Sequence, residues 1–367
     1  MKRILHVVSC FDTGGTEAFI MSQFRNIDTS IYKFDFLILM ADSSPYQNEI
    51  EKLGGRVFYV HAKPNLLNIF SLKKILRKII CNYGPYDIVH SHINQANAIV
   101  LLTAKLLGIK NLISHSHNTN LSGGGLIRNM IFRLQQKIIR NSATILCACS
   151  NEAGIELYGN KTKFHIINNG IEFSRFANAI PQLDYRKEFN IPSCNKIYGN
   201  ISRFDAQKNI PFVVDVFNEI CKYQPNSTLI IGGQPGDKYK ETISKIHNYK
   251  LEGKVVILNR RNDMPQLLKV MDAYIFPSTF EGLGIALLET QASGVPAFTS
   301  TNVPKFADVE LGLLTYISLK EGPYKWAKTI LSYKAPSTTV AQRLDKFRVS
   351  GYDIKTSVKK LEALYEQ

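Results

Sequence analysis

The chain has 367 residues, of which 45% are hydrophobic and 20% charged, and its formal net charge at pH 7 is +15. This length is enough for two domains with separate cores, and the composition is typical of a folded protein. No run approaches the roughly eighteen uninterrupted apolar residues that a membrane-spanning helix needs. The six cysteines have neither zinc nor disulfide spacing, so we expect reduced thiols in the cytoplasm.

Short runs rich in Ile, Val and Leu alternate with amphipathic segments from the first residues to about residue 330. This alternation is typical of β-α units around parallel sheets, and it predicts an α/β protein. The strands predicted in the first half are Ile4–Ser9, Asp35–Met40, Arg56–Val60, Asp87–His90, Leu112–His115, Thr144–Cys149 and Phe164–Ile167.

Glycines follow the first strand. Gly14 and Gly15 precede Thr16-Glu17 and open a helix, where they permit a tight turn and bring backbone N–H groups close to a ligand. A simple strand-to-helix turn explains the same residues. The pattern matches neither a dinucleotide-binding GxGxxG motif nor a GxxxxGK[ST] phosphate loop.

Two segments of the first half carry clustered basic residues. Lys73, Lys74, Arg77 and Lys78 recur at helical spacing, and so do Arg133, Lys137 and Arg140, with Arg128 nearby. A solvated helix face is one interpretation, and attraction to an anionic membrane surface is the other. Nucleic acid is disfavoured as a partner, because no nucleic-acid module and no interleaving of basic and aromatic residues occurs.

Two His-Ser-His triplets each close a predicted strand of the first half. Alternation along a strand places His90 and His92 on one side, and likewise His115 and His117. The four rings could hold a metal, or they could be satisfied by hydrogen bonds at the sheet edge. His117 precedes the loop that starts at Asn118, so we expect it to reach a ligand, as a hydrogen-bonding partner or as a group that shares developing charge.

A less periodic stretch with turn-forming residues follows Asn169-Gly170 and extends to Pro192, and we place the interdomain linker there. The expected domains are residues 1–180 and 181–346, followed by a C-terminal helix within 347–367 that has one apolar side. The second-half strands are predicted at Ile197–Ser202, Thr228–Gly232, Lys254–Leu258, Ala273–Phe276, Val295–Thr299 and Leu313–Ile317.

Two cations follow the first strand of the second domain. Arg203 comes at the end of this strand, and Lys208 stands five residues later at a helix start. At the carboxyl end of a strand they can neutralise a diphosphate, with Arg as a planar fork and Lys as a point charge. Fixed cations at this place would stabilise a departing diphosphate more than the ground state. A surface Arg and Lys in a loop are the alternative.

The most informative segment lies between Pro277 and Glu289. Glu281 is expected at a glycine turn, and Glu289 inside the helix that follows. Backbone N–H groups at such a helix start favour an anion, and carboxylates accept hydrogen bonds from sugar hydroxyls. A nucleotide-sugar presents both complements. The chain has no Asp-x-Asp pair, which disfavours a metal-chelated diphosphate, so we expect no metal and no cofactor.

Taken together, these motifs resemble the GT-B glycosyltransferases of family four, especially the bacterial capsular and exopolysaccharide branch. The resemblance covers nearly the whole chain. It rests on Gly14-Gly15-Thr16-Glu17, Asp87 to His92, His115 to Asn118, Asn169 to Glu172, Ser202-Arg203 with Lys208, Glu281 to Pro296, and Tyr352-Asp353 with the helix after it. It implies two Rossmann-like doubly wound domains facing a central cleft, with the C-terminal helix packed on the first domain.

The resemblance also implies a retaining, metal-independent transfer, usually explained by front-face attack. It assigns the diphosphate to Arg203 and Lys208, the ribose to Glu289, the donor sugar to Glu281, and the sugar or leaving-group side to His117. The remaining residues expected to bind substrate are Gly14, Gly15, His92, Asn118, Gly282, Leu283, Gly284 and Ile285.

The function predicted from the sequence is therefore transfer of a sugar, from UDP by preference, to a saccharide acceptor that is lipid-linked. This would serve surface polysaccharide biosynthesis at the cytoplasmic face of the membrane. A nucleotide-sugar epimerase of the same architecture and a non-catalytic nucleotide-sugar-binding protein are the alternatives. The epimerase would turn over the donor without an acceptor, and the binding protein would neither transfer nor hydrolyse it.

Overall fold

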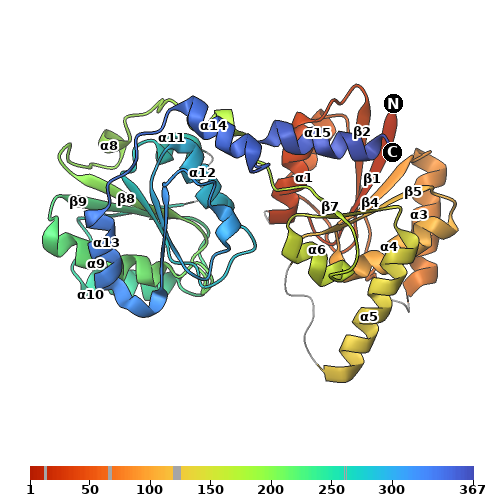
Figure 1. Cartoon of the computed structure of the whole chain (residues 1–367), viewed down its shortest axis with the longest axis horizontal. Helices are drawn as coiled ribbons and strands as arrows, with labels where there is room; N and C mark the ends of the chain where they lie inside the picture. The colour runs from red at the N-terminus through yellow and green to blue at the C-terminus, as the bar shows by residue number, and fades with distance from the viewer. Residues whose placement is uncertain (12–14, 65–67, 119–124, 260, 262) are drawn as a thin grey trace. The chain divides into compact units, whose positions relative to one another are not determined.

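The computed structural model describes all residues except 12–14, 65–67, 119–124, 260 and 262 (Figure 1). The described chain forms two compact units. The first unit contains Met1–Gly170 together with Ile354–Gln367, and the second contains Ile171–Asp353. Each unit is an α/β structure with its own core.

The described strands of the first unit form one parallel sheet of seven strands in the order β3-β2-β1-β4-β5-β6-β7. The chain reverses its direction of sheet growth between β1 and β4, which are hydrogen-bonded neighbours. The strands are β1 (Lys2–Val8), β2 (Tyr32–Ile38), β3 (Val57–Tyr59), β4 (Ile88–Ser91), β5 (Asn111–Ser116), β6 (Ile145–Ala148) and β7 (His165–Ile166).

Helices cover this sheet and supply apolar side chains to its core, including Phe19 and Phe24 on α1 and Leu72 and Leu76 on α3. The described helices of the unit are α1 (Gly15–Asn26), α2 (Gln47–Lys52), α3 (Ile69–Tyr83), α4 (Asn97–Leu106), α5 (Gly125–Ser142), α6 (Asn151–Tyr158) and α15 (Ile354–Tyr365).

The described strands of the second unit form a parallel sheet of six strands in the order β10-β9-β8-β11-β12-β13, with the reversal between β8 and β11. The strands are β8 (Lys196–Ile201), β9 (Ser227–Gly232), β10 (Val255–Leu258), β11 (Ala273–Phe276), β12 (Ala297–Ser300) and β13 (Leu314–Ile317). The helices are α7 (Phe173–Ala177), α8 (Tyr185–Glu188), α9 (Ile210–Tyr223), α10 (Tyr239–Asn248), α11 (Met264–Leu268), α12 (Ile285–Ser293), α13 (Gly322–Ser332) and α14 (Val340–Val349).

Helix α15 belongs to the first unit although it ends the chain. Val358, Leu361 and Leu364 are buried in the same core as α1, as the spacing of apolar residues predicted. Polar contacts add to this packing: the Gln23 side-chain amide donates to the Ser357 hydroxyl over 2.7 Å. The C-terminal helix thus packs with its apolar face in the core of the first unit.

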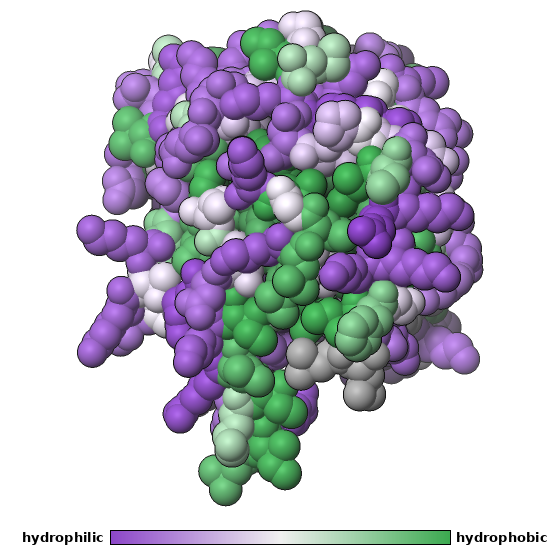
Figure 2. Space-filling view, turned by 90° about the vertical axis from the view of Figure 1, so that its right-hand side faces the viewer, coloured by the Kyte–Doolittle hydropathy of each residue, from purple (hydrophilic) through white to green (hydrophobic). Residues whose placement is uncertain are grey.

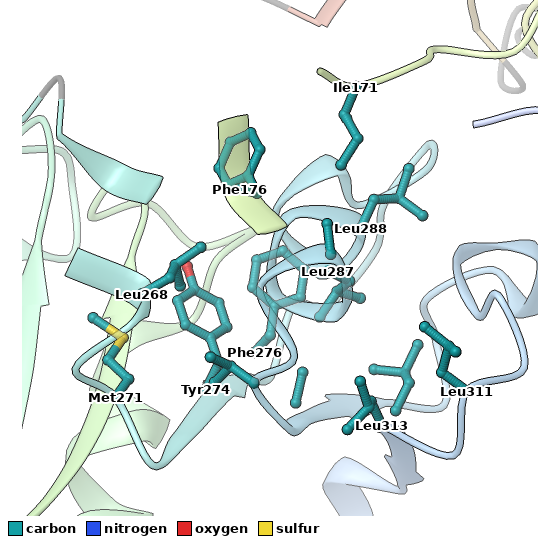
Figure 3. Close-up of a cluster of buried hydrophobic side chains, with 14 of the residues drawn as sticks. Ile171, Phe176, Leu268, Met271, Tyr274, Phe276, Leu287, Leu288, Leu311 and Leu313 are labelled. Carbon is teal, nitrogen blue, oxygen red and sulfur yellow. The ribbon is translucent and has the colours of Figure 1, made fainter. Parts of the chain in front are cut away.

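The units divide at Gly170–Ile171, earlier than the expected boundary at residue 180. The reason is burial: Ile171 and Phe176 pack into the second unit's core with Leu287 and Leu288 of α12 (Figure 3). The second change of unit comes at Ile354, later than the expected residue 347. The preceding helix α14 buries Phe347 in the second unit and was not anticipated there.

Candidate functional site

Three charged side chains come together where the second sheet reverses its order. Arg203 and Lys208 follow β8, and Glu281 follows the neighbouring strand β11. Ligands of open α/β sheets bind at the carboxyl ends of the strands flanking such a reversal. The sequence placed these residues at strand ends, and the strand order makes them neighbours.

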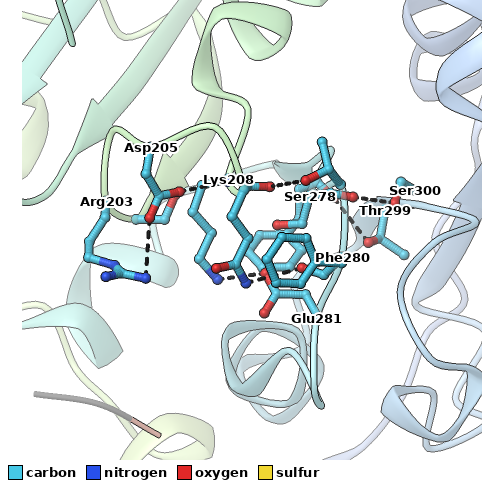
Figure 4. Close-up of polar contacts among 12 residues, drawn as sticks. Arg203, Asp205, Lys208, Ser278, Phe280, Glu281, Thr299 and Ser300 are labelled. Atoms are coloured by element: carbon cyan, nitrogen blue, oxygen red, sulfur yellow. Dashed lines mark hydrogen bonds and ion pairs between the residues drawn. The ribbon is translucent and has the colours of Figure 1, made fainter. Parts of the chain in front are cut away.

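Lys208 and Glu281 form an ion pair, with Lys208 Nζ 2.6 Å from Glu281 Oε1 (Figure 4). The side chains are only 17% and 8% exposed, so the pair is held with little water around it. Lys208 Nζ also lies 5.1 Å from the centre of the Phe276 ring. This pairing keeps the ammonium group in one place, and the second carboxylate oxygen of Glu281 can still accept a hydroxyl hydrogen bond.

Arg203 is the more exposed of the two cations. Its guanidinium lies 3.2 Å from Asp205 Oδ2, yet the side chain is 62% exposed. Asp205 also accepts the backbone N–H of Lys208 over 2.9 Å, which ties the two cations to one loop. An exposed guanidinium can exchange a carboxylate for a phosphate at low cost, because both present the same pair of oxygens.

Hydrogen bonds join the loop after β8 to the loop after β11. The Thr279 N–H donates to the Gln207 carbonyl over 2.8 Å, and the Gln207 side-chain amide donates to the Phe280 carbonyl over 3.1 Å. Asn302, which follows β12, also holds the loop after β11, since its side-chain amide donates to the Thr279 carbonyl over 3.0 Å. These bonds fix Glu281 relative to Lys208.

Glu281 lies in the turn that precedes helix α12, which begins at Ile285, as expected. Gly284 is its N-cap and has φ 81°, a left-handed conformation that glycine adopts without strain. The first backbone N–H groups of a helix have no partner within it and favour an anion. Gly282, Leu283 and Ile285 complete this turn and were all named from the sequence.

Glu289 lies within α12, more than one helical turn after the N-cap residue Gly284. Burial raises the pKa of its carboxyl group to about 7, and the positive charge of Arg175 opposes this shift. Glu289 and Glu281 both contribute to raising the pKa of Tyr274, for which burial is the larger cause. Both carboxylates therefore lie close enough to Tyr274 to disfavour ionisation of its phenol.

The glycine segment after β9 was not recognised as part of this site. Gly233 has φ +138°, and a Cβ there would lie 2.2 Å from the Ser202 carbonyl oxygen. A Cβ on Gly236 would lie 2.5 Å from the Phe204 carbonyl oxygen. The segment thus packs against the backbone on both sides of Arg203. The clustered glycines after a predicted strand were the signal.

A cavity of about 730 Å³ opens near the end of β10, on the other side of β9 from Arg203. Its lining combines apolar Phe189 and Ile257 with polar Asn259, Arg261 and others. Arg261 is fixed there by Asp263 and Glu188.

In the first unit the histidine triplets form one buried cluster, which His6 of β1 joins. The sequence did not single out His6, because only the pairing of β1 with β4 places it opposite His90. One chain of hydrogen bonds runs from His6 through His92 to His117, with N···N distances of 3.0 and 2.9 Å. A second runs from the Tyr365 hydroxyl through His90 to His115.

The histidine rings are neutral at pH 7. Burial lowers the pKa of His6 and of His117 to about 3. The pKa values of His90, His92 and His115 are also well below the usual value, through burial first and neighbouring histidines second. Most of the rings are stacked, with the centres of His90 and His92 4.2 Å apart. The short N···N distances and the stacked rings are consistent with neutral imidazoles that hydrogen-bond to one another.

A metal remains an alternative occupant of the cluster, since His92, His115 and His117 each bring a nitrogen within 4.8 Å of the others, as do His6, His90 and His92. His117 Nδ1 is buried without a partner among the described residues. The lowered pKa of His117 favours hydrogen bonding over sharing of positive charge.

The other expected residues of the first unit are only partly described. Gly15 starts α1 and is exposed, whereas Gly14 lies outside the described residues. Phe19 of α1 contacts the rings of His115 and His117, at 5.1 and 5.4 Å between ring centres. Asn118 is exposed directly after His117. The start of α1 and the end of β5 thus lie close to the histidine cluster.

In the part of the chain that the structure describes, no helix combines the length and the apolar character needed to span a bilayer.

Two family models match the chain. The model described as Glycosyltransferase Family 4 matches residues 13–175, and the model described as Glycosyl transferases group 1 matches residues 181–311. Together they cover every strand of the two sheets except β1 and β13, and they include the histidine triplets and the segment from Arg203 to Glu289.

The chain is 31% identical to the putative glycosyltransferase EpsF of Bacillus subtilis, over 99% of this chain and 96% of EpsF. It is 25% identical to the capsular polysaccharide biosynthesis glycosyltransferase CapH of Staphylococcus aureus, over 90% of each. An Escherichia coli relative, the UDP-Gal:alpha-D-GlcNAc-diphosphoundecaprenol alpha-1,3-galactosyltransferase, is 24% identical over 81% of this chain and 79% of its own.

Among solved structures, Anabaena Alr3699/HepE in complex with UDP and glucose matches with a TM-score of 0.78 and 17% identity, covering 100% of both chains. At this identity the match shows the fold alone.

Proposed function

This chain belongs to glycosyltransferase family 4, in its exopolysaccharide and capsule branch, and we propose that it transfers a sugar from UDP to a lipid-linked saccharide with retention of configuration. Its fold is GT-B, and it is a glycosyltransferase of polysaccharide biosynthesis. The observation that carries the finer proposal is the Lys208–Glu281 pair beside Arg203 at the reversal of the second sheet.

Three parts of the donor fit groups of the second unit. Arg203, Lys208 and the start of α12 supply the positive charge and N–H donors that a diphosphate requires. Glu289 accepts hydrogen bonds from the ribose hydroxyls, and Glu281 contacts the transferred sugar together with the adjacent backbone. The cavity near β10 has room for the base. UDP is favoured as the carrier because HepE was crystallised with UDP and the E. coli relative is named for UDP-galactose.

The proposed chemistry needs no divalent ion, because fixed cations take its place. The bond between the anomeric carbon and the β-phosphate oxygen breaks, and charge builds on that oxygen beside Lys208 and Arg203. The acceptor hydroxyl attacks the same face of the sugar and gives its proton to the departing phosphate. The new bond therefore keeps the configuration of the old one.

For the first unit we propose the acceptor role at the cytoplasmic face of the membrane. His117 is a neutral imidazole with a buried nitrogen, Nδ1, that lacks a partner among the described residues, and it suits a hydroxyl of the sugar or of the acceptor. The diphosphoundecaprenol acceptor in the name of the E. coli relative supports a lipid-linked acceptor for this chain.

The test is an assay of nucleotide release with the purified protein, a panel of nucleotide sugars and a membrane lipid extract. We expect release only when both a UDP-sugar and the extract are present, with an α-linked product from an α-donor, and unchanged rates in EDTA. Activity that is lost with chelator and restored by a divalent ion would reject the metal-free mechanism.

The same assay distinguishes the other two functions. An epimerase would convert the donor to its isomer without the extract, and a binding protein would shift its melting temperature with UDP while releasing nothing. The charged residues of the second unit favour transfer over simple binding, because a cation aimed at the leaving group contributes mostly in the transition state.

A further inference from the structure

Helix α5 carries an apolar face that nothing in the described chain covers. Its first two turns contain only exposed residues, and the exposed large hydrophobic side chains are Leu126, Ile127, Met130, Ile131 and Leu134. They are between 47% and 85% exposed. No other described helix gathers so many. Figure 2 shows a continuous apolar strip on the projecting lower part of the surface, where α5 lies.

The helix is attached to its unit by its other end and its other side. Ile139 is buried against Ala148 and Leu157, with Phe132 packed beside them. The Arg140 guanidinium donates to the Tyr158 carbonyl over 2.9 Å. At about 100° per residue, Ile139 and Phe132 lie roughly opposite the centre of the exposed apolar arc. The exposed face therefore points away from the unit's own core.

Basic residues flank this apolar face, and acidic ones are absent from the helix. Arg133 and Lys137 are exposed at one edge of the arc, and Arg128 is exposed near the other. The segment Gly125–Ser142 contains no Asp or Glu. Exposed apolar residues between basic flanks are typical of a helix that lies in the headgroup region of an anionic bilayer.

We propose that α5 inserts its apolar face into an anionic membrane surface and thereby anchors the protein beside its lipid-linked acceptor. The position beside a lipid-linked acceptor rests on the proposed function, but the insertion into the membrane does not. A helix in this position buries its apolar side chains to a depth of about 5–10 Å while Arg128, Arg133 and Lys137 contact phosphates. The exposed basic residues Lys74, Arg77 and Lys78 of α3 belong to the same unit and add long-range attraction.

The experiment is co-flotation of the full-length protein with vesicles, without nucleotide sugar. Vesicles of phosphatidylcholine with 30% phosphatidylglycerol are compared with pure phosphatidylcholine at low and high salt. We expect binding to the anionic vesicles, weakened by salt. Ile127→Glu combined with Met130→Glu should reduce partitioning by more than about tenfold, because charge replaces the inserted side chains.

Two variants serve as controls for charge and for the donor site. Val349→Glu combined with Ile180→Glu places the same two charges on apolar residues of the second unit that are 79% and 77% exposed, and this variant should float like the wild type. Lys208→Ala should also float normally while losing transfer, so failure of the membrane surface and failure of the donor site give different results. Arg133→Ala should weaken binding to anionic vesicles by about fivefold, the factor that corresponds to one basic contact.

Several outcomes would overturn the proposal. The first is equal flotation of the wild type and the double variant. The second is a lower melting temperature of the double variant without lipid, which would show that the chain itself covers this face. The third is a wild-type oligomer that the double variant turns into a monomer while vesicles bind neither, which would make the face a contact between copies of the chain.

Discussion

At the scale of single residues, the chemistry of the proposed donor site depends on how Lys208 and Glu281 are held. Their pairing at 2.6 Å with little exposure means that each residue fixes the other. The residues around Lys208 in the sequence do not indicate its pairing with Glu281, because the two residues stand 73 positions apart. Because they are paired, Glu281, which we assign to the sugar, and Lys208, which we assign to the diphosphate, should be tested together.

We predict that Lys208→Ala and Glu281→Ala each lower kcat for transfer by about a hundredfold or more, because a cation beside the leaving oxygen contributes on that scale. Each variant should lose about 1–3 kcal/mol of stability, since its partner is left partly buried and unpaired. The double variant should lose less than the sum. Chemical denaturation and steady-state rates measure both effects.

Lys222→Ala is the matched control for this prediction. Lys222 lies 2.6 Å from Glu219 but is 56% exposed, so its removal should alter neither stability nor rate noticeably. Rates like those of the wild type in Lys208→Ala would remove Lys208 from the mechanism.

Glu289 gives a pH prediction. Its pKa is raised to about 7 in the folded state from the ordinary 4.5, so the folded protein holds a proton that the unfolded chain releases. This group therefore stabilises the fold fully below pH 4.5, and the contribution is lost as pH rises through about 7, a difference of roughly 3 kcal/mol at most. Urea titrations from pH 5 to 8 should show this slope in the wild type, and a smaller one in Glu289→Gln.

Ligand binding should show the opposite trend, because the ionised carboxylate is the better acceptor for ribose hydroxyls. The affinity of the wild type for UDP should rise as pH increases from 6 to 8. Glu289→Gln should bind UDP more weakly and without that rise. A pH-independent affinity in the wild type would contradict the ribose role.

At the scale of elements, the site is held by loops that the strands bring together. The predicted strands are all present within a few residues of their expected ends, because buried parallel strands read as short apolar runs bounded by turn residues. The glycine segment after β9 was read only as the end of a strand. Its contact with Ser202 and Phe204 depends on β8 and β9 being neighbours, which periodicity does not reveal.

Gly233→Ala should therefore damage the donor site from a distance. Its Cβ would meet the Ser202 carbonyl oxygen at 2.2 Å, and its φ of +138° disfavours a side chain. We expect a stability loss of about 2 kcal/mol or more and weaker UDP binding through displacement of Arg203. Gly253→Ala is the control, since no atom lies within 4 Å of its added Cβ. A normal UDP affinity in Gly233→Ala would exclude the supporting role.

At the scale of the whole molecule, the two units differ in continuity. The second unit is one uninterrupted segment, residues 171–353, whereas the first requires α15 from the end of the chain. We predict that a fragment of residues 171–353 folds cooperatively and that its melting temperature rises with UDP, because the proposed donor groups all lie within it. A fragment that melts cooperatively without responding to UDP, while the full chain responds, would place essential donor contacts in the first unit.

The sequence by itself determined the α/β class, the strand positions and the family resemblance, and it supplied the charged residues that we propose for the donor site. Local patterns carry this information, since apolar periodicity, glycine turns and charge at strand ends depend on near neighbours in the chain. The boundary at Gly170–Ile171 was decided only by which core Ile171 and Phe176 enter.

Tertiary structure alone also decided the Lys208–Glu281 pair, the inclusion of His6 in the histidine cluster and the exposure of the apolar face of α5. Each of these depends on strand order or on which helix faces find a partner. Such choices are made by the burial of surfaces far apart in the sequence, and no local pattern of residues records them.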